Sequence, residues 1–214
     1  MNNMFNLKVN RLNQLNKSNY WFSIWLRPKK VIYSIISSNP NYGLWTLSSI
    51  CGLFLFFRLM QILSLKEWFF FIIGWMMSPF LGFGFISIIA WSFYKIGKMF
   101  RGKGDFYSVR AAVAWSQVPI IFHLISWGVF FAFCGKNSLF YIPNILSLYK
   151  VITISIFYII QIIASIWSFC LCVCLLSYVQ FFPKSKALIN MIFSIFTLIG
   201  FFLVAVLFFS ALKI

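Results

Sequence analysis

Five long apolar runs constrain this chain more than any other feature of its sequence. They cover about residues 44–63, 68–94, 111–133, 151–178 and 188–212. A helix of about 20 mostly apolar residues crosses roughly 30 Å of hydrocarbon. Each run reaches that length, and none has the alternation of a porin strand, the other structure that can cross lipid. The runs therefore predict an all-α, polytopic membrane protein with a bundle of five transmembrane helices.

Composition also indicates that lipid is the solvent. Hydrophobic residues make up 62% of the chain and charged residues only 9%, whereas about a quarter of a soluble domain is charged. The net charge of +16 arises because Glu67 and Asp105 are the only acids. In a soluble protein such an excess would suggest nucleic acid. Here the basic residues flank the apolar runs, as in membrane proteins, so no nucleic-acid partner is expected.

The positions of these basic residues predict the orientation. Most lie in the segment before the first run and in the connections after the second and fourth runs. Positive charge is retained in the cytoplasm. We therefore expect the N-terminus in the cytoplasm and the C-terminus outside.

The chain divides into a cytosolic arm, residues 1–43, and a five-span membrane domain, residues 44–212. Within the arm, Pro28 suits the first turn of a helix. An apolar stripe follows and ends at Asn39–Pro40; it consists of Val31, Ile32, Ile35 and Ile36. This pattern predicts a short amphipathic helix, Pro28–Ser38, that lies in the cytosolic interface. Whether it has any partner other than lipid is left open.

The connection after the second run resembles a phosphate-binding loop. Residues Gly97–Gly104 spell G-x-x-x-x-G-K-G, but such a loop follows a strand and ends in a Ser or Thr hydroxyl. Here an apolar helix precedes Gly97, and Gly104 takes the hydroxyl position. The pattern predicts a flexible basic connector and no nucleotide site. We expect one basic cytosolic surface near the headgroups, formed by Lys29, Lys30, Lys98, Arg101, Lys103 and Arg110.

Several segments resemble a known family. They are "IWLRPKKVIYSII", "GKGDFYSVRAAVAWSQVP" and "VQFFPKSKALIN". The second contains a Gly-x-Gly before an aromatic residue and then a small-aromatic-Ser-x-x-Pro pattern, with the residues Gly102, Gly104, Phe106, Ala114, Trp115, Ser116 and Pro119. Together with five spans and a cytoplasmic N-terminus, these segments resemble the Yip-domain family of Ypt/Rab-interacting membrane proteins, in its prokaryotic type. The Asp-Leu-Tyr-Gly-Pro signature of eukaryotic members is absent. The resemblance implies a multi-pass protein of the bacterial inner (plasma) membrane and does not imply Rab binding.

Polar residues inside the runs are candidate intramembrane contacts. Gln117, Pro119 and His123 lie in the third run, and ionisable residues in lipid usually face the bundle interior. No carboxylate lies in any run, so we expect a neutral His123 hydrogen-bonded to another helix. Gln161 and Asn190 are expected to make similar contacts, and Arg58 can extend toward the outer interface.

Two further patterns concern packing. Pro79, Gly82 and Gly84 in the second run predict a kink and a close helix contact. The run Cys170, Cys172 and Cys174 suggests a metal site at first sight. Residues two apart on a helix do not share a face, and a thiolate in hydrocarbon would need compensating charge. These cysteines are therefore predicted to pack, and no metal or cofactor is expected.

Three classes of function remain open. The first is a non-catalytic membrane organiser or adaptor; its partners would be membrane lipids, with a protein partner or self-association also open. The second is a small transporter or channel with a pathway near the third run. An intramembrane enzyme is the weakest, because His123 is the sole conventional base. A water-filled cavity around Gln117 and His123 would favour transport, whereas contacts with side chains of another helix would favour the adaptor.

Overall fold

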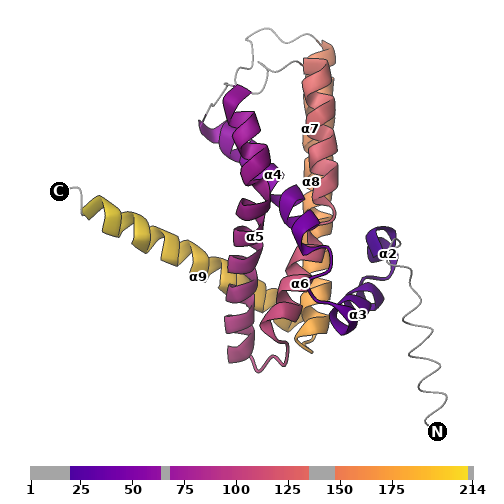
Figure 1. Cartoon of the computed structure of the whole chain (residues 1–214), viewed down its shortest axis with the longest axis vertical. Coiled ribbons are helices and arrows are strands. Elements are labelled where there is room, and N and C mark those ends of the chain that lie inside the picture. Colours follow the sequence, from indigo (N-terminus) through magenta and orange to yellow (C-terminus); the bar gives the residue numbers. More distant parts are fainter. Residues whose placement is uncertain (1–19, 64–67, 135–147, 212–214) are drawn as a thin grey trace. The chain divides into compact units, whose positions relative to one another are not determined.

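The computed structural model describes residues 20–63, 68–134 and 148–211 (Figure 1). All secondary structure in these ranges is helical, which confirms the all-α prediction. The elements are α2 (Tyr20–Leu26), α3 (Pro28–Ser38), α4 (Leu44–Leu63), α5 (Trp68–Met99), α6 (Phe106–Ser116), α7 (Ile120–Cys134), α8 (Leu148–Val179) and α9 (Lys184–Ala211). The first 19 residues of the predicted arm lie outside the described residues.

Four helical segments are long and apolar enough to cross a membrane. They are Ile72–Met99, Phe106–Phe130, Val151–Val179 and Lys184–Val204. The remaining apolar helix is shorter, Leu44–Met60 in α4. The chain is therefore a multi-pass membrane protein, and α4 as a fifth crossing stays a prediction.

The chain forms two compact units. The first unit contains Met1–Tyr42, Ser87–Val113 and Val173–Ile214, and the second contains Gly43–Ile86 and Ala114–Cys172. Helices α5, α6 and α8 contribute residues to both units.

The third predicted run is two helices and not one. Helix α6 ends at Ser116 and α7 begins at Ile120. Pro119 has no N–H to donate and disfavours a helical conformation in the residue before it. The intervening residues form a turn, in which Gln117 N donates to Ala114 O at 3.0 Å and Ile120 N donates to Gln117 O at 2.9 Å. The expectation of a continuous helix over 111–133 was therefore wrong.

In the second unit, α4 and α5 touch backbone to backbone. A Cβ added to Gly82 would lie 1.8 Å from Ser48 O, and one added to Gly52 would lie 1.8 Å from Ser78 O. The close contact predicted at Gly82 is confirmed. The prediction was wrong for Gly84, where an added Cβ would meet nothing within 4 Å.

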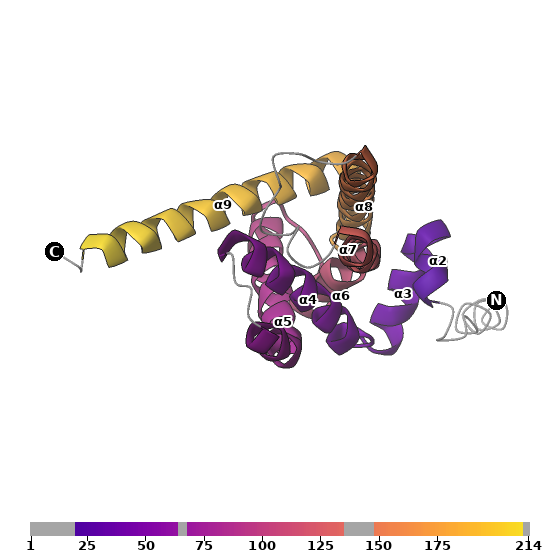
Figure 2. The same cartoon turned by 90° about the horizontal axis from the view of Figure 1, so that it is seen from above.

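Helices α7 and α8 lie side by side in the same unit (Figures 1 and 2). Their contact is an aromatic cluster of Trp127, Phe130 and Phe157, with Ile154 packed against it. The rings of Trp127 and Phe157 have centroids 5.0 Å apart and meet edge to face. Such pairs stabilise packing beyond the burial of their area alone.

In the first unit, α2 and α3 form a helical hairpin (Figure 2). Helix α3 has the predicted bounds, Pro28–Ser38. Tyr20 Oη and Ser34 Oγ join the two helices by a hydrogen bond of 2.7 Å. The apolar stripe of α3 was expected to face lipid, but Val31, Ile32 and Ile35 are fully buried in the protein. Packing against other segments of the protein already shields these side chains from water, so they do not need to insert into lipid.

Candidate functional site

The connection between α5 and α6 packs directly against the turn between α8 and α9. A Cβ added to Gly97 would lie 1.9 Å from Gln180 Oε1, and one added to Gly102 would lie 2.6 Å from the same atom. One added to Gly104 would lie 2.9 Å from Val179 O. The three glycines therefore permit close packing. The expectation of a flexible connector was wrong, because the segment is held against a second turn. We call residues 97–105 and 177–184 together the double turn.

Buried amides hold the double turn together. Gln180 Nε2 donates to Phe93 O at 2.9 Å, and Asn190 Nδ2 donates to the same oxygen at 3.1 Å. Lys103 N donates to Gln180 O at 3.2 Å. Asn190 was expected to join helices, whereas Gln180 was missed. No local sequence pattern marks Gln180 at the end of its apolar helix. Its hydrogen-bond partners are distant from it in the sequence.

Each half of the double turn reverses through a residue with left-handed backbone. Arg101 has φ 65° and Phe181 has φ 58°. Gly102 N donates to Gly97 O at 2.8 Å, and Phe182 N donates to Ser177 O at 2.9 Å. This is the Schellman pattern that ends many helices, in which glycine usually takes the left-handed position. At this position a residue with a side chain raises the free energy of the folded protein by about 1–3 kcal/mol relative to glycine.

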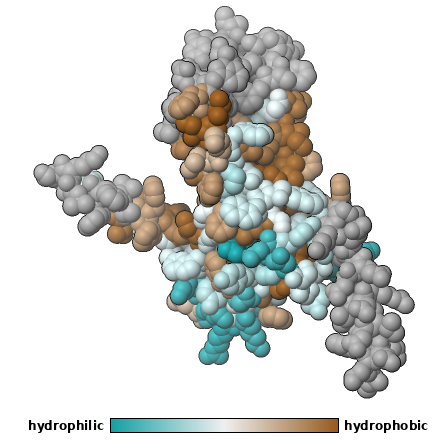
Figure 3. Space-filling model, in the orientation of Figure 1, coloured by the Kyte–Doolittle hydropathy of each residue, from teal (hydrophilic) through white to brown (hydrophobic). Residues whose placement is uncertain are grey.

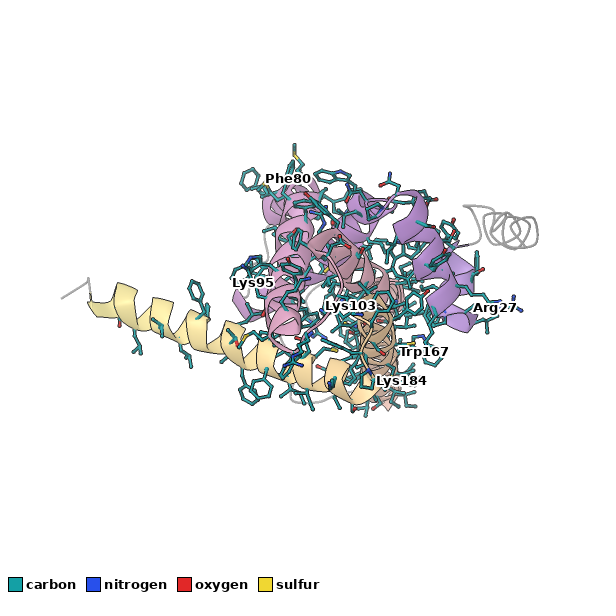
Figure 4. The ribbon with its side chains drawn as sticks, turned by 90° about the horizontal axis from the view of Figure 1, so that it is seen from below. Arg27, Phe80, Lys95, Lys103, Trp167 and Lys184 are labelled. Carbon is teal, nitrogen blue, oxygen red and sulfur yellow. The ribbon has the colours of Figure 1, made fainter. Side chains whose placement is uncertain are left out.

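Most of the predicted basic residues are exposed in the first unit. Lys98, Arg101 and Lys103 are exposed on the double turn, and Lys29 and Lys30 are exposed on α3. The space-filling view shows hydrophilic side chains gathered at the C-terminal end of α5 (Figure 3). Lys184 and Lys186, at the start of α9, are exposed as well. In the view from below, Arg27 projects at the edge of the α2–α3 hairpin, away from Lys95 and Lys103 (Figure 4).

Arg110 does not belong to this exposed set. It was expected on the basic surface, but it is only 9% exposed. Its Nη2 donates to Asn41 Oδ1 at 2.8 Å, and its guanidinium lies over the rings of Phe106 and Tyr107, at 5.4 and 5.2 Å. A planar cation can be buried when it stacks on rings and donates to an oxygen. Arg110 therefore joins α6 to the turn after α3.

Asp105 caps the N-terminus of α6. Its Oδ2 accepts a hydrogen bond from Ser108 N at 3.1 Å, and its Oδ1 accepts one from Ser108 Oγ. Partial burial raises the pKa of this carboxyl, but the hydrogen bonds from Ser108 and nearby backbone groups outweigh burial and lower the pKa below its ordinary value. Asp105 is thus held as a carboxylate at the start of the helix, where negative charge is favourable.

The cap makes a testable contribution to stability. We expect Asp105→Ala to lower the free energy of unfolding by about 1 kcal/mol, whereas Asp105→Asn, an equally good cap, should stay close to the unchanged protein. Because the folded pKa is lowered, the contribution is present above the unfolded pKa of about 3.9 and is lost as pH falls through the folded value. Melting temperatures of the detergent-purified variants at neutral pH test the first expectation. Equal losses for Ala and Asn would contradict the capping role.

The comparison with family models addresses the identity of the chain. The model of the Yip1 domain matches residues 22–207. The chain belongs to the Yip1 domain family. No curated protein and no solved structure matched it. The resemblance inferred from the motifs is confirmed, and the matched residues include all of α3 to α8.

The small-aromatic-Ser-x-x-Pro pattern of this Yip1 domain has a packing role in the second unit. Trp115 is fully buried, and its ring lies so close to Gly43 that an added Cβ would be 3.0 Å from Trp115 Cζ2. Gly43 has φ 70°, a backbone conformation that favours glycine. Ser116 O accepts a hydrogen bond from Ser168 Oγ at 2.9 Å. The pattern therefore joins the end of α6 to α8 and to the residue that precedes α4.

A polar cluster lies among the membrane-spanning helices of the second unit. His123 Nδ1 is hydrogen-bonded to Gln161 Oε1. Gln161 Nε2 donates to Ser126 Oγ at 2.8 Å, and Ser126 Oγ donates to His123 O at 2.8 Å. Ser165 Oγ lies 3.4 Å from His123 Nε2. His123 thus meets side chains of α8.

Arg58 completes this intramembrane cluster, which we define as Arg58, His123, Ser126, Gln161 and Ser165. Its Nη2 donates to Gln161 Oε1 at 3.3 Å. Its guanidinium lies 5.4 Å from the ring centroid of Phe54 and 5.9 Å from that of Trp127. Arg58 was expected to extend toward the outer interface. It contacts the cluster instead, because an amide oxygen and two aromatic faces stabilise its charge there.

The other predicted residues of the third run lie at the α6–α7 turn. Pro119 is buried, and Gln117 is half-buried, with its Nε2 donating to Ser116 Oγ at 3.4 Å. Among the hydrogen bonds of the described residues, none joins Gln117 to the intramembrane cluster. Gln117 and His123 therefore belong to separate contacts.

A groove of about 300 Å³ runs between α7 and α8. Ser126 and Thr153 are its polar lining residues, and the others are Phe122, Ile125, Val129, Phe130, Ile156, Phe157 and Ile160. A surface of this kind suits hydrocarbon and not a column of water.

Two of the three neighbouring cysteines on α8 lie in different surroundings. Cys172 is buried and Cys170 is exposed, so the two do not share a face. Within the described ranges, no three His, Cys, Asp or Glu side chains are grouped so that they could hold a metal ion.

Proposed function

We propose that this integral membrane protein is a non-catalytic organiser or adaptor that recruits an acidic partner, protein or lipid, to its cytoplasmic face. The N-terminus lies in the cytoplasm and the C-terminus outside, in accord with the distribution of Lys and Arg. The family resemblance favours a bacterial inner membrane.

The observation that supports the proposal most strongly is the double turn. Lys98, Arg101 and Lys103 are exposed on a segment whose backbone is held by a hydrogen bond from Lys103 N to Gln180 O and by the close packing of its glycines against Gln180 and Val179. A cation on a rigid turn loses less conformational freedom on binding than one on a mobile loop. Charges that served only to orient the helices would not need such support.

The alternative, a small transporter or channel, has less support. The groups of the intramembrane cluster bond to one another and to aromatic rings, and the neighbouring groove is lined mainly by apolar side chains. Transport through the third span would require polar groups that line a hydrated path. Side-chain partners for His123 favour a packing role.

Charge substitution tests the adaptor proposal. Changing Lys98, Lys103 and Lys184 together to Gln should weaken capture of the native partner, most strongly at low salt, where the charges of the unchanged protein are least screened, whereas the same three positions changed to Arg should retain it. Each cation beside an anionic surface contributes about 1 kcal/mol, so the triple change should reduce affinity on the order of 100-fold. The measurement is crosslinking in the native membrane and pull-down at a series of salt concentrations.

The control for this series is correct insertion. Protease or thiol-labelling accessibility of the Gly97–Arg110 segment must be the same in the Gln variant as in the unchanged protein. A correctly inserted Gln variant that keeps every partner at every salt concentration would show that these charges act only on orientation.

A further inference from the structure

Two side chains occupy backbone positions where glycine would be more favourable. Arg101 and Phe181 are the non-glycine residues with positive φ among those described. Both end membrane-spanning helices, α5 and α8, in the same hydrogen-bonding pattern. Glycine takes the left-handed conformation at Gly43, also among the described residues. Residues strained in this way cluster at functional sites, where the surrounding structure maintains them.

Neither side chain is retained there by packing within the protein. Phe181 is 76% exposed, and Arg101 is exposed as well. The double turn is supported by its backbone and by the buried amide of Gln180, which shares Phe93 O as acceptor with Asn190 of α9. The two strained side chains project from this support, so packing among the described residues does not offset the cost of their backbone conformation.

The double turn lies where a bilayer would end. The candidate spans Ile72–Met99 and Val151–Val179 end at the double turn, and the candidate span Lys184–Val204 begins there. Met99 is 80% exposed, so two large apolar side chains, Met99 and Phe181, project at this boundary beside exposed cations. Aromatic rings favour the headgroup layer, and cations favour the phosphates of an anionic leaflet.

We propose that the double turn is a binding site for anionic phospholipid headgroups. Arg101, Lys103 and Lys184 contact the headgroup phosphate, and Phe181 and Met99 enter the boundary between headgroups and acyl chains. Arginine is suited to the phosphate because its planar guanidinium donates two parallel hydrogen bonds. A lipid is the occupant because it offers phosphate and hydrocarbon together at the end of a membrane span. This site rests on the proposed function and specifies one class of partner for it.

The test compares stability with and without lipid. We would purify Arg101→Gly and Phe181→Gly in detergent and measure melting temperatures alone, with phosphatidylglycerol and with phosphatidylcholine. Without lipid, each glycine variant should melt a few degrees higher than the unchanged protein, because the left-handed strain is removed. Phosphatidylglycerol should raise the melting temperature of the unchanged protein more than phosphatidylcholine does, since a ligand of the folded state stabilises it. Each glycine variant should lose at least half of that difference.

Matched variants separate the effects of the Arg101 charge and the Phe181 ring from the effect of the left-handed backbone. Arg101→Lys keeps the cation and should keep most of the phosphatidylglycerol effect, whereas Arg101→Asn tolerates the left-handed backbone without the cation and should lose it. Phe181→Trp keeps an interfacial ring and should behave like the unchanged protein. Inorganic phosphate, added in place of lipid, should produce no comparable shift.

Three results would overturn the site. They are an undiminished phosphatidylglycerol effect in both glycine variants, a lower lipid-free melting temperature in both, and an equal shift with inorganic phosphate. If the lipid effect is undiminished but salt-dependent capture of an acidic protein is lost in the triple Gln variant, the lipid site fails and the adaptor proposal stands. If neither depends on these residues, both fail.

Discussion

Gly82→Ala should leave little or no folded protein, whereas Gly84→Ala, two residues away on the same helix, should be tolerated. A Cβ on Gly82 would lie 1.8 Å from Ser48 O, a backbone atom of α4 that cannot move without moving the helix. Separating two packed helices also removes the contacts on both sides of the crossing. We expect a loss of more than about 3 kcal/mol in the free energy of unfolding, at the upper end of overpacking effects.

Gly84→Ala is the matched control. An added Cβ there would meet nothing within 4 Å, and alanine is favoured over glycine in a helix by about 1 kcal/mol. Size-exclusion profiles of the detergent-solubilised variants after heating would measure the difference. Gly52→Ala should fail in the same way as Gly82→Ala, because its Cβ would lie equally close to Ser78 O. Wild-type melting of Gly82→Ala would mean that the helices do not meet at this point.

Gln161→Leu should be the second most damaging change, with an expected loss of about 2–4 kcal/mol. The Gln161 amide accepts a hydrogen bond from Arg58 and donates one to Ser126, and it is bonded to His123. Leucine would fill similar space but would leave several buried polar groups without this partner, at about 1–3 kcal/mol for each group that stays unsatisfied. Each hydrogen bond of this kind between membrane helices contributes about 0.6–2 kcal/mol. This range limits the total loss of stability expected for Gln161→Leu.

Two variants bracket this prediction. Ile162→Leu changes the neighbouring residue, which is 58% exposed, and should have almost no effect on the melting temperature. Gln161→Glu keeps the acceptor for Arg58 and should cost less than Gln161→Leu. If Gln161→Leu and Ile162→Leu melt at the same temperature, the cluster contributes nothing to stability and a hydrated pathway becomes the better explanation for its polar residues.

Local sequence was sufficient for part of the fold. The apolar runs predicted a multi-pass helical membrane protein because length and hydropathy decide whether a segment can cross lipid. The bounds of α3 followed from Pro28 at its start and Asn39–Pro40 after its end. The same rules apply to Pro119, where the third run breaks, although apolar residues continue on both sides of the break.

The candidate site could be predicted only in part, because its decisive contacts join distant segments. Arg110 and Asn41 are 69 residues apart, and Gln180 and Phe93 are 87 apart. From composition alone, Arg110 is one more cation beside an apolar run, and nothing near it in the sequence indicates that an amide and two rings remove it from the surface. The glycines of the connector suggested flexibility for the same reason, since the segment that packs against them is not adjacent in sequence.

The sequence by itself therefore determined that this protein lies in a membrane, that it is helical and that it belongs to the Yip1 domain family, because these properties depend on patterns within single segments. Only the tertiary structure decided which polar and apolar groups are available to a partner. The apolar stripe of α3 is buried, Arg110 is withdrawn, and Arg101 and Phe181 project from strained turns. Whether a side chain is exposed to a partner depends on which other segments of the chain pack over it. Those segments are distant in sequence, so no local pattern identifies them.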